Sequence, residues 1–487
     1  MIKLLILLLG LVACGGKKSG EPTAPQIPTE RPTEEPPPLS TPRPGHINFD
    51  WVEQFMQRDA ENLTPDERNQ ARYLVATHLY NQGIGEFNPD RIEQAINRGL
   101  NGLSGENPFP GRAVPIDENR TIYRFFREDF SMSQEEWIGL GNRVIYDVIP
   151  DTIRNQTLQF LVGAIKPWLF ADDIMTTAYC ADTETEQDCM YYDLTEQPVN
   201  NVDFFRFNIG IDVQDQYNRQ RVALAGGDDS SIAQATDRIV EIIDTPNRGF
   251  LQTTYDVSQA QQDAVILNPF TKEAAQAGGT FRSDKIFNHL ANEFIFELPN
   301  GAPGWRLSNA AGIAEVTAPQ DIVSDIEQRD IDGAIRIGAC SNCHGIDLSI
   351  NFTDDVANNC LNIGSFDALE KQTCEVFFNR TRFEGFQSAI NQRYRAFNKT
   401  IGVDSDQQDP LVNVLIRPMR GELVAAKVCA RTFLTEDECL QRLQGTTDSI
   451  ASLGSLLSGQ TVTLRSSRIG FQDLIRELNI FRDRGQL

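Results

Sequence analysis

Cys340-Ser341-Asn342-Cys343-His344 is the stretch that says most about the fold and chemistry of this chain. Two thiols stand three positions apart and an imidazole follows directly, which is the attachment pattern of c-type haem. This spacing lets both thiols add across the two vinyl groups of one haem, while the adjacent imidazole ligates the iron. A zinc site is the main metal alternative, but zinc takes four ligands and no second Cys/His pair is obviously placed to complete the set. The sequence therefore predicts one covalent haem c on Cys340 and Cys343, with His344 as an axial iron ligand.

The remaining cysteines are consistent with an oxidising compartment. The chain has nine cysteines. When the two haem thiols and Cys14 are set aside, the others fall into three local pairs, and such pairs form disulfides outside the cytosol. We expect the bonds Cys180–Cys189, Cys360–Cys374 and Cys429–Cys439, although sequence alone leaves free thiols and other pairings open.

The N-terminus has the anatomy of an export signal. Lys3 precedes a short apolar run that ends in Leu11-Val12-Ala13-Cys14, which looks like a bacterial lipobox. The resemblance implies cleavage before Cys14 and lipid on that cysteine, the alternative being an ordinary signal peptide. Residue 15 is Gly rather than Asp, which favours the outer membrane over the inner one. We therefore expect a lipid-anchored protein of the bacterial envelope that faces the periplasm.

Composition and charge narrow the classes of partner. The formal net charge is −24, with 44 Lys and Arg against 68 Asp and Glu. Such an excess of negative charge repels phosphate backbones, so nucleic acid is not an expected partner. The expected partners are the lipid bilayer and a redox protein with a basic docking surface.

The chain divides by composition into five stretches. Residues 1–13 are the expected signal peptide, and residues 14–46 form a lipidated, Pro-rich tether. Residues 47–200 are expected to be mostly helical, residues 201–330 mixed α/β, and residues 331–487 a helical, cytochrome c-like haem domain. The expected fold class is α+β and mainly helical.

Several local signals predict individual elements. Capping residues at Thr64, Ser133 and Thr435 indicate helix starts, each with Glu three positions later. Leu74, Val75, His78 and Leu79 fit helical spacing, and residues 120–126 read as a strand. Residues 294–307 are expected to form two strands around a turn at Asn300-Gly301, with Pro299 and Pro303 weakening a tight hairpin.

Residues 294–344 resemble a group of large, single-haem, cytochrome c-like bacterial proteins. The parallels are the segments Phe296-Glu297-Leu298-Pro299-Asn300-Gly301, Ala318-Pro319-Gln320-Asp321-Ile322-Val323-Ser324-Asp325 and Gly338-Ala339-Cys340, with weaker ones at Arg72-Tyr73-Leu74, Leu100-Asn101-Gly102-Leu103-Ser104, Thr121-Ile122-Tyr123-Arg124 and Asp409-Pro410-Leu411-Val412. The chain has Trp305 where the group usually has Tyr, and it lacks the group's Gly-rich element. The resemblance implies a haem domain and assigns no substrate.

The sixth iron position has one main candidate. Met419 is the only methionine after the haem motif, and Pro418 directly before it suits an extended ligand loop. A packing role for Met419 is the alternative, and His289 is a weaker ligand candidate. A labile or vacant position stays open.

Three function classes remain. The first is electron transfer by a membrane-anchored periplasmic cytochrome, and it is preferred over an enzyme. The second is a haem-containing oxidoreductase or ligand sensor with an open sixth position, but the sequence contains no nucleotide-binding, P-loop, zinc-protease or nucleophile-elbow motif. The third is an envelope-binding lipoprotein with a structural haem. No catalytic residue is assigned.

Overall fold

The computed structural model describes most of the chain between residues 45 and 463. The described residues are 45–82, 87–144, 166–181, 189–211, 221–227, 237–245, 249–256, 289–318, 337, 340, 344, 362, 364, 366–404, 409–416, 422–423, 429–444 and 462–463. Cys14, Cys343, Cys360 and Met419 lie outside them, as do the signal peptide and nearly all of the tether. Residues 40–487 form one compact unit.

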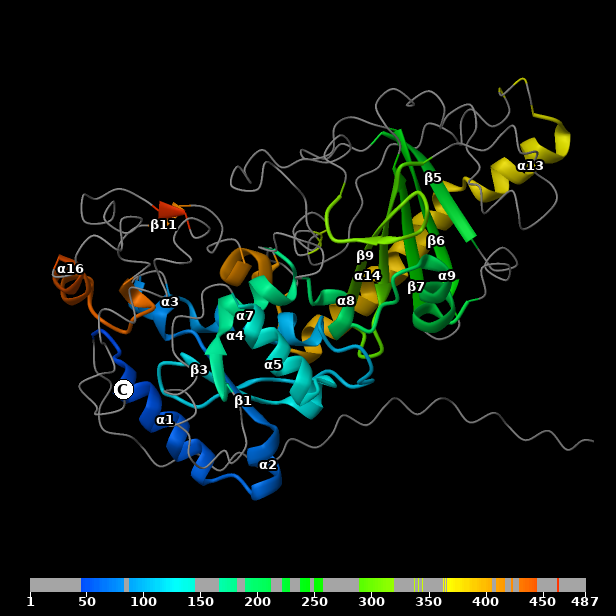
Figure 1. The fold of residues 1–487 in the computed structure, drawn as a ribbon. Coiled ribbons are helices and arrows are strands. Elements are labelled where there is room, and N and C mark those ends of the chain that lie inside the picture. The colour runs from blue at the N-terminus through cyan, green and yellow to red at the C-terminus, as the bar shows by residue number, and fades with distance from the viewer. Residues whose placement is uncertain are drawn as a thin grey trace, which may run out of the picture. The chain divides into compact units, whose positions relative to one another are not determined.

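The first region combines helices with a four-stranded sheet (Figure 1). The sheet has the order β2-β3-β1-β4, in which β1 is antiparallel to β3 and parallel to β4. The elements of this first region, in chain order, are α1 (Phe49–Glu61), α2 (Pro65–Gln70), β1 (Ala71–Val75), α3 (Thr77–Gln82), α4 (Pro89–Asn101), β2 (Val114–Pro115), β3 (Ile122–Phe126), the 3₁₀ turn η1 (Arg127–Phe130), α5 (Gln134–Arg143), β4 (Trp168–Phe170), α7 (Ala171–Ala178) and α8 (Tyr191–Leu194).

One prediction in this region is wrong. Leu74 and Val75 lie in strand β1, not in the helix that their spacing suggested. Helix α2 ends at Gln70, and the next five residues pair with β3 on one side and β4 on the other. These strands come from segments far away in the sequence, so the pairing that overrides the local pattern is not visible in a short window.

The second region is a six-stranded antiparallel sheet in simple sequential order. It follows α9 (Asn201–Asp203) and the π-helical turn η3 (Phe204–Ile209), and its strands are β5 (Arg221–Gly227), β6 (Asp237–Thr245), β7 (Gly249–Asp256), β8 (Ala291–Glu297), β9 (Pro303–Asn309) and β10 (Ala314–Glu315). The predicted strand pair is confirmed: β8 and β9 are joined by a turn in which Gly301 has a φ of 86°.

The last region is mainly helical. It contains α13 (Ala368–Phe377), α14 (Arg380–Thr400), the π-helical turn η9 (Leu411–Ile416), α16 (Glu436–Gln444) and the short strand pair β11 (Glu422–Leu423) and β12 (Val462–Thr463). The chain therefore combines helices with two larger sheets that are mainly antiparallel, which is consistent with the expected α+β class. A cytochrome c-like domain within it stays a prediction.

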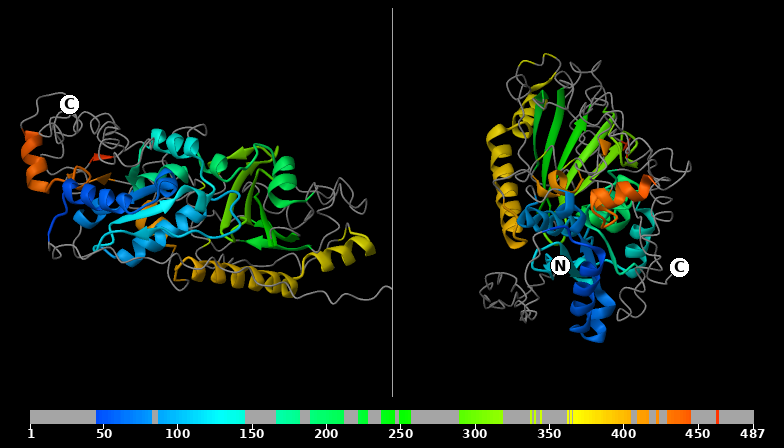
Figure 2. Two further views of the ribbon diagram at one scale, coloured as in Figure 1. Left: turned by 90° about the horizontal axis from the view of Figure 1, so that it is seen from below. Right: turned by 90° about the vertical axis from the view of Figure 1, so that its left-hand side faces the viewer.

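The six-stranded sheet has a hydrophobic core on each face. Alternate side chains on one face, including Val240, Ile295 and Trp305, pack in a core with Phe383 and Tyr394 of α14. Figure 2 shows α14 running along this sheet. The other face packs against η3 in a second core, which includes Phe204, Ile243, Leu251, Phe294 and Phe296. The first core also contains Cys340.

Candidate functional site

Two residues of the predicted haem motif, Cys340 and His344, are described, and both have helical conformation. Cys340 is 2% exposed within the first hydrophobic core, whereas the His344 side chain is 16% exposed. The motif's second thiol, Cys343, lies outside the described residues.

Cys340 and His344 both contact the same carboxylate on the sheet. Nε2 of His344 lies 3.2 Å from Oε1 of Glu293 in strand β8, and the thiol of Cys340 also hydrogen-bonds to Glu293. The Glu293 side chain is only 17% exposed. A thiol, an imidazole and a carboxylate thus converge at the point where the motif meets the sheet.

The local charges hold Glu293 ionised. Burial by itself would raise its pKa, but the charge and hydrogen bond of His344, the charge of Arg238 and the hydrogen bond from Cys340 outweigh burial. The pKa of Glu293 therefore lies below its ordinary value. Arg238 in the neighbouring part of the sheet also pairs with Asp256, with Nε 3.2 Å from Oδ1.

Trp305 provides an aromatic wall beside the histidine. Its ring stacks on the His344 ring with centroids 5.7 Å apart and an interplanar angle of 28°. The backbone of Trp305 is held on both sides, because its N–H donates to the Tyr191 hydroxyl at 3.0 Å and its carbonyl accepts from Gln197 Nε2 at 3.1 Å. The segment around α8 therefore fixes the strand position against which the His344 ring rests.

The donor set at this place fits a covalent haem, with one conflict. Cys340 and His344 both contact Glu293 and lie among apolar and aromatic side chains, which is the kind of surrounding that a haem c needs. However, a ring nitrogen binds either a carboxylate or a metal, so Nε2 is available to iron only when Glu293 releases it. The bond between His344 and Glu293 and iron ligation through Nε2 are mutually exclusive.

The other histidines with described positions have partners elsewhere. His78 is fully buried and its Nε2 lies 2.8 Å from Oδ2 of Asp172. His46 Nε2 lies 2.8 Å from the Leu434 carbonyl oxygen. His289 packs edge-on against Tyr255 with ring centroids 5.5 Å apart.

The disulfide predictions agree with the structure where the residues are described. Cys180 bonds to Cys189 and Cys429 bonds to Cys439. Cys374 is also disulfide-bonded, and its predicted partner Cys360 lies outside the described residues. The ligand candidate Met419 and the predicted lipidation site Cys14 lie outside them as well.

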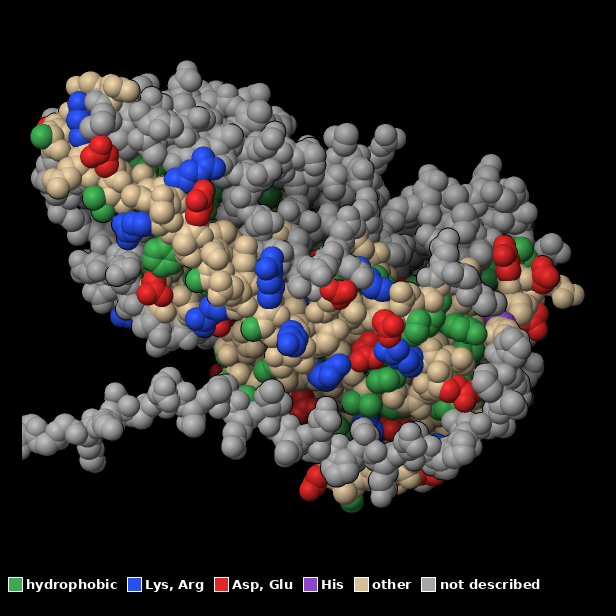
Figure 3. Space-filling model, turned by 180° about the vertical axis from the view of Figure 1, so that it is seen from behind, with side chains coloured by type: hydrophobic (Ala, Val, Ile, Leu, Met, Phe, Trp, Pro, Cys, Tyr) green, Lys and Arg blue, Asp and Glu red, His purple; other side chains and the backbone are tan. Residues whose placement is uncertain are grey.

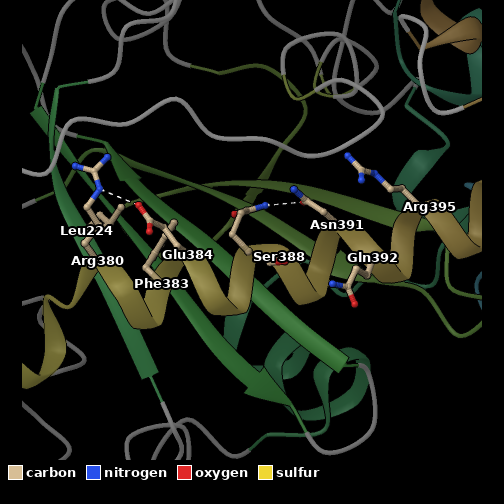
Figure 4. A pocket seen from close by; sticks show the side chains of 9 residues that line it. Leu224, Arg380, Phe383, Glu384, Ser388, Asn391, Gln392 and Arg395 are labelled. Atoms are coloured by element: carbon tan, nitrogen blue, oxygen red, sulfur yellow. Dashed lines mark hydrogen bonds and ion pairs between the residues drawn. The ribbon is translucent and has the colours of Figure 1, made fainter.

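A polar groove on α14 is separate from this cluster. It has a volume of about 360 Å³ and lies beside Leu224 of β5, along one side of the helix (Figure 4). Arg380 Nε donates to Glu384 at 3.0 Å, and Gln387 Nε2 donates to Asn391 at 3.0 Å, so its polar groups partly satisfy each other. The groove shares no lining residue with the Glu293–His344 cluster.

Glu293 and Trp305 were not singled out by sequence reasoning as site residues. One signal for Glu293 existed: in strand β8 it occupies the same face as Ile295, so a charged residue stands where the alternation calls for an apolar one. A buried carboxylate needs a partner, but nothing in the sequence names His344, which is 51 residues away.

Comparisons with known proteins identify no relative of this chain. No family model, no curated protein and no solved structure matches this chain. Within the described part of the chain, no group of three or more His, Cys, Asp and Glu side chains could hold a metal ion together. Among the described helices, none combines the length and apolar character needed to cross a bilayer.

Proposed function

We propose that this chain is an electron-transfer protein that carries one covalent haem c on Cys340 and Cys343, with His344 as an axial ligand. The observation that carries the proposal is the motif Cys340-Ser341-Asn342-Cys343-His344, and it is supported by the contact of Cys340 and His344 with one carboxylate, Glu293, beside Trp305. When bound, the haem supplies an iron that changes between its ferric and ferrous states.

The protein's own residues would attach the haem, orient it and shield it. Cys340 and Cys343 would hold the group by thioether bonds, and His344 would offer a ring nitrogen. Trp305 stacks on the His344 ring and so limits its tilt. Glu293 has to give up its bond to Nε2 if this nitrogen binds iron, and Arg238 is the nearby charge already acting on that carboxylate.

The test is covalent haem on the denatured chain. The full-length gene is expressed in cells that attach haem to c-type cytochromes, and the denatured polypeptide is stained for haem peroxidase activity. We expect staining of the parent and none for the double variant Cys340→Ala, Cys343→Ala. The control Cys429→Ala, Cys439→Ala also loses two cysteines, which form a disulfide elsewhere, and should keep the stain. A parent protein without haem iron would contradict the proposal.

We propose Met419 as the sixth iron ligand. Thioether ligation gives oxidised cytochromes an absorption band near ~695 nm and raises the potential relative to two histidines. Met419→Ala should abolish this band, lower the potential and open the iron to CO, while covalent haem is retained. If the oxidised spectrum and the potential are unchanged, Met419 is a packing residue. A high-spin parent spectrum that shifts with CO or peroxide would instead favour the oxidoreductase or sensor.

We propose that Cys14 anchors the protein in the bacterial envelope, with the outer membrane preferred. Cys14→Ser should move the protein from the membrane to the soluble periplasmic fraction or leave the signal peptide uncleaved. Normal processing and unchanged fractionation would contradict this.

The acidic chain favours a basic redox partner with salt-sensitive docking. On the face drawn in Figure 3, acidic and basic side chains are interspersed, so the excess negative charge is not gathered into one patch of the described surface there.

A further inference from the structure

Two buried arginines meet at the edge of the four-stranded sheet. Arg72 lies in β1 and is fully buried, and Arg127 begins η1 and is 6% exposed. Nη1 of Arg72 and Nη2 of Arg127 each donate to the carbonyl oxygen of Asn69, and each donor–acceptor distance is 3.2 Å. The two guanidinium groups therefore lie next to each other around one backbone oxygen.

Among the described residues, these two side chains donate hydrogen bonds only to neutral backbone oxygens. Nη1 of Arg72 also donates to the Ala71 carbonyl at 2.6 Å, and Nη1 of Arg127 donates to the Met132 carbonyl at 3.1 Å. Nε and Nη2 of Arg72 and Nε of Arg127 are buried, and no acceptor within the described part of the chain lies in reach of them. Three charged N–H donors are thus left without a partner.

This pair differs from the other buried arginines that the structure describes. Arg98 and Arg238 each pair with an aspartate, and Arg431 pairs with two. Arg306 donates to three oxygen atoms and packs over two aromatic rings. Within the described residues, no carboxylate lies at ion-pair distance from Arg72 or Arg127, although the charges of Glu135 and Glu128 act on Arg127 from farther away.

The electrostatics of the pair are unfavourable as they stand. Burial, and next the charge of Arg127, lower the pKa of Arg72 to about 10. Arg72 is therefore still charged at neutral pH, beside a second cation and away from water. Buried charges in proteins are normally paired, because desolvation without a counter-charge is costly.

We propose that Arg72 and Arg127 form a buried binding site for a small inorganic anion of the size of chloride. The ligand would accept hydrogen bonds from Nε and Nη2 of Arg72 and Nε of Arg127, and it would neutralise one of the two charges. A small anion is preferred over a phosphate ester or an organic acid because Arg72 has no exposed surface. By joining Arg72 to Arg127, the anion would fasten the start of β1 to η1, and through Asn69 to the end of α2. This inference does not depend on the haem.

The first test measures thermal unfolding of the full chain as chloride replaces gluconate at constant ionic strength. Gluconate is too large to enter a closed site. We expect the unfolding midpoint to rise with chloride and to level off as the site fills. Arg72→Met should abolish this dependence and Arg127→Met should weaken it. The control Arg380→Met removes an exposed arginine and should respond as the parent does.

A second test locates the anion directly and does not require any variant to fold. Crystals of the parent protein are soaked in sodium bromide, and an anomalous difference map is calculated. A bromide peak within hydrogen-bond distance of Arg72 Nε or Nη2 is the expected result. The proposal is overturned if this position is empty or holds only water, or if chloride and gluconate give equal unfolding midpoints in the parent.

Discussion

Asp117 is a buried carboxyl that organises the turn before β3. Its Oδ1 accepts from the backbone N–H groups of Thr121 and Ile122, and its Oδ2 accepts from the Thr121 hydroxyl. Burial raises the pKa of Asp117 to about 6, because desolvation outweighs these hydrogen bonds. The folded-state pKa therefore exceeds that of the unfolded chain. The stability that follows from this shift is present below about pH 4 and is lost as the pH rises through about 6.

We predict that Asp117→Asn removes this part of the pH dependence. Between about pH 4 and pH 7 the parent should lose about 3 kcal/mol of unfolding free energy relative to the variant, since a pKa shift of one unit corresponds to ~1.4 kcal/mol. The measurement is urea unfolding at several pH values. Exposed Asp437→Asn is the control and should keep the parent's slope. Equal slopes for the parent and Asp117→Asn would contradict the assignment.

Single residues show where prediction from sequence stopped. The capping residues Thr64 and Ser133 could be recognised, because each bonds to a Glu only three positions away. The partner of His78 could not, since Asp172 is 94 residues away. His78 looked like an ordinary helix residue, and it does lie in α3, but it is fully buried and hydrogen-bonded to Asp172.

At the scale of elements, two glycines differ in whether their position requires glycine. Gly301 has a φ of 86° in the β8–β9 turn, a conformation in which other residues are strained. Asn300 beside it donates to the Asn101 carbonyl at 2.9 Å, so this turn also holds the sheet to the end of α4. Gly385 lies in the interior of α14, where a Cβ atom would meet nothing within 4 Å.

We predict that Gly301→Ala lowers the unfolding free energy by about 1–2 kcal/mol and that Gly385→Ala raises it by about 0.5–1 kcal/mol. The first change forces a Cβ into the left-handed region, and the second replaces a poor helix former by the best one. Chemical denaturation of both variants measures the difference, and each serves as the control for the other. If both variants changed the unfolding free energy in the same direction, the φ angle at Gly301 would not be what determines the effect of its replacement.

Elements defined by short-range signals were predictable and elements defined by pairing were not. The Asn300-Gly301 turn forms the strand pair that the sequence indicated. Strand β1 was mistaken for helix, because Leu74 and Val75 satisfy helical spacing and only β3 and β4 make them a strand. The contact of Glu293 with Cys340 and His344 has the same origin, since it joins residues that are far apart in the sequence.

At the scale of the whole molecule, Arg431 connects the C-terminal segment to the first region. Its Nη1 lies 2.6 Å from Oδ1 of Asp173 and its Nη2 lies 2.5 Å from Oδ2 of Asp172, the carboxylate that also binds His78. Arg431 packs over the Phe170 ring at 5.5 Å, and all four charged or titratable groups are nearly free of solvent contact. The arginine thus neutralises two carboxylates from the start of α7, which come from a distant part of the chain.

We predict that Arg431→Met lowers the unfolding free energy by about 3–5 kcal/mol, because it leaves Asp172 and Asp173 buried without their cation. It should also raise the pKa of His78, since the Arg431 charge now lowers it and the Asp172 charge would act alone against burial. Denaturant unfolding gives the first quantity, and NMR titration of the His78 ring gives the second.

Arg431→Lys keeps a charge but loses the two-pronged contact, so its unfolding free energy should lie between those of the parent and Arg431→Met. It replaces the methionine variant as the test if that variant does not fold. Arg380→Met, which breaks an exposed pair, should cost less than about 0.5 kcal/mol. An Arg431→Met protein within ~1 kcal/mol of the parent would mean that the C-terminal segment is held to the first region by its apolar contacts rather than by this charge cluster.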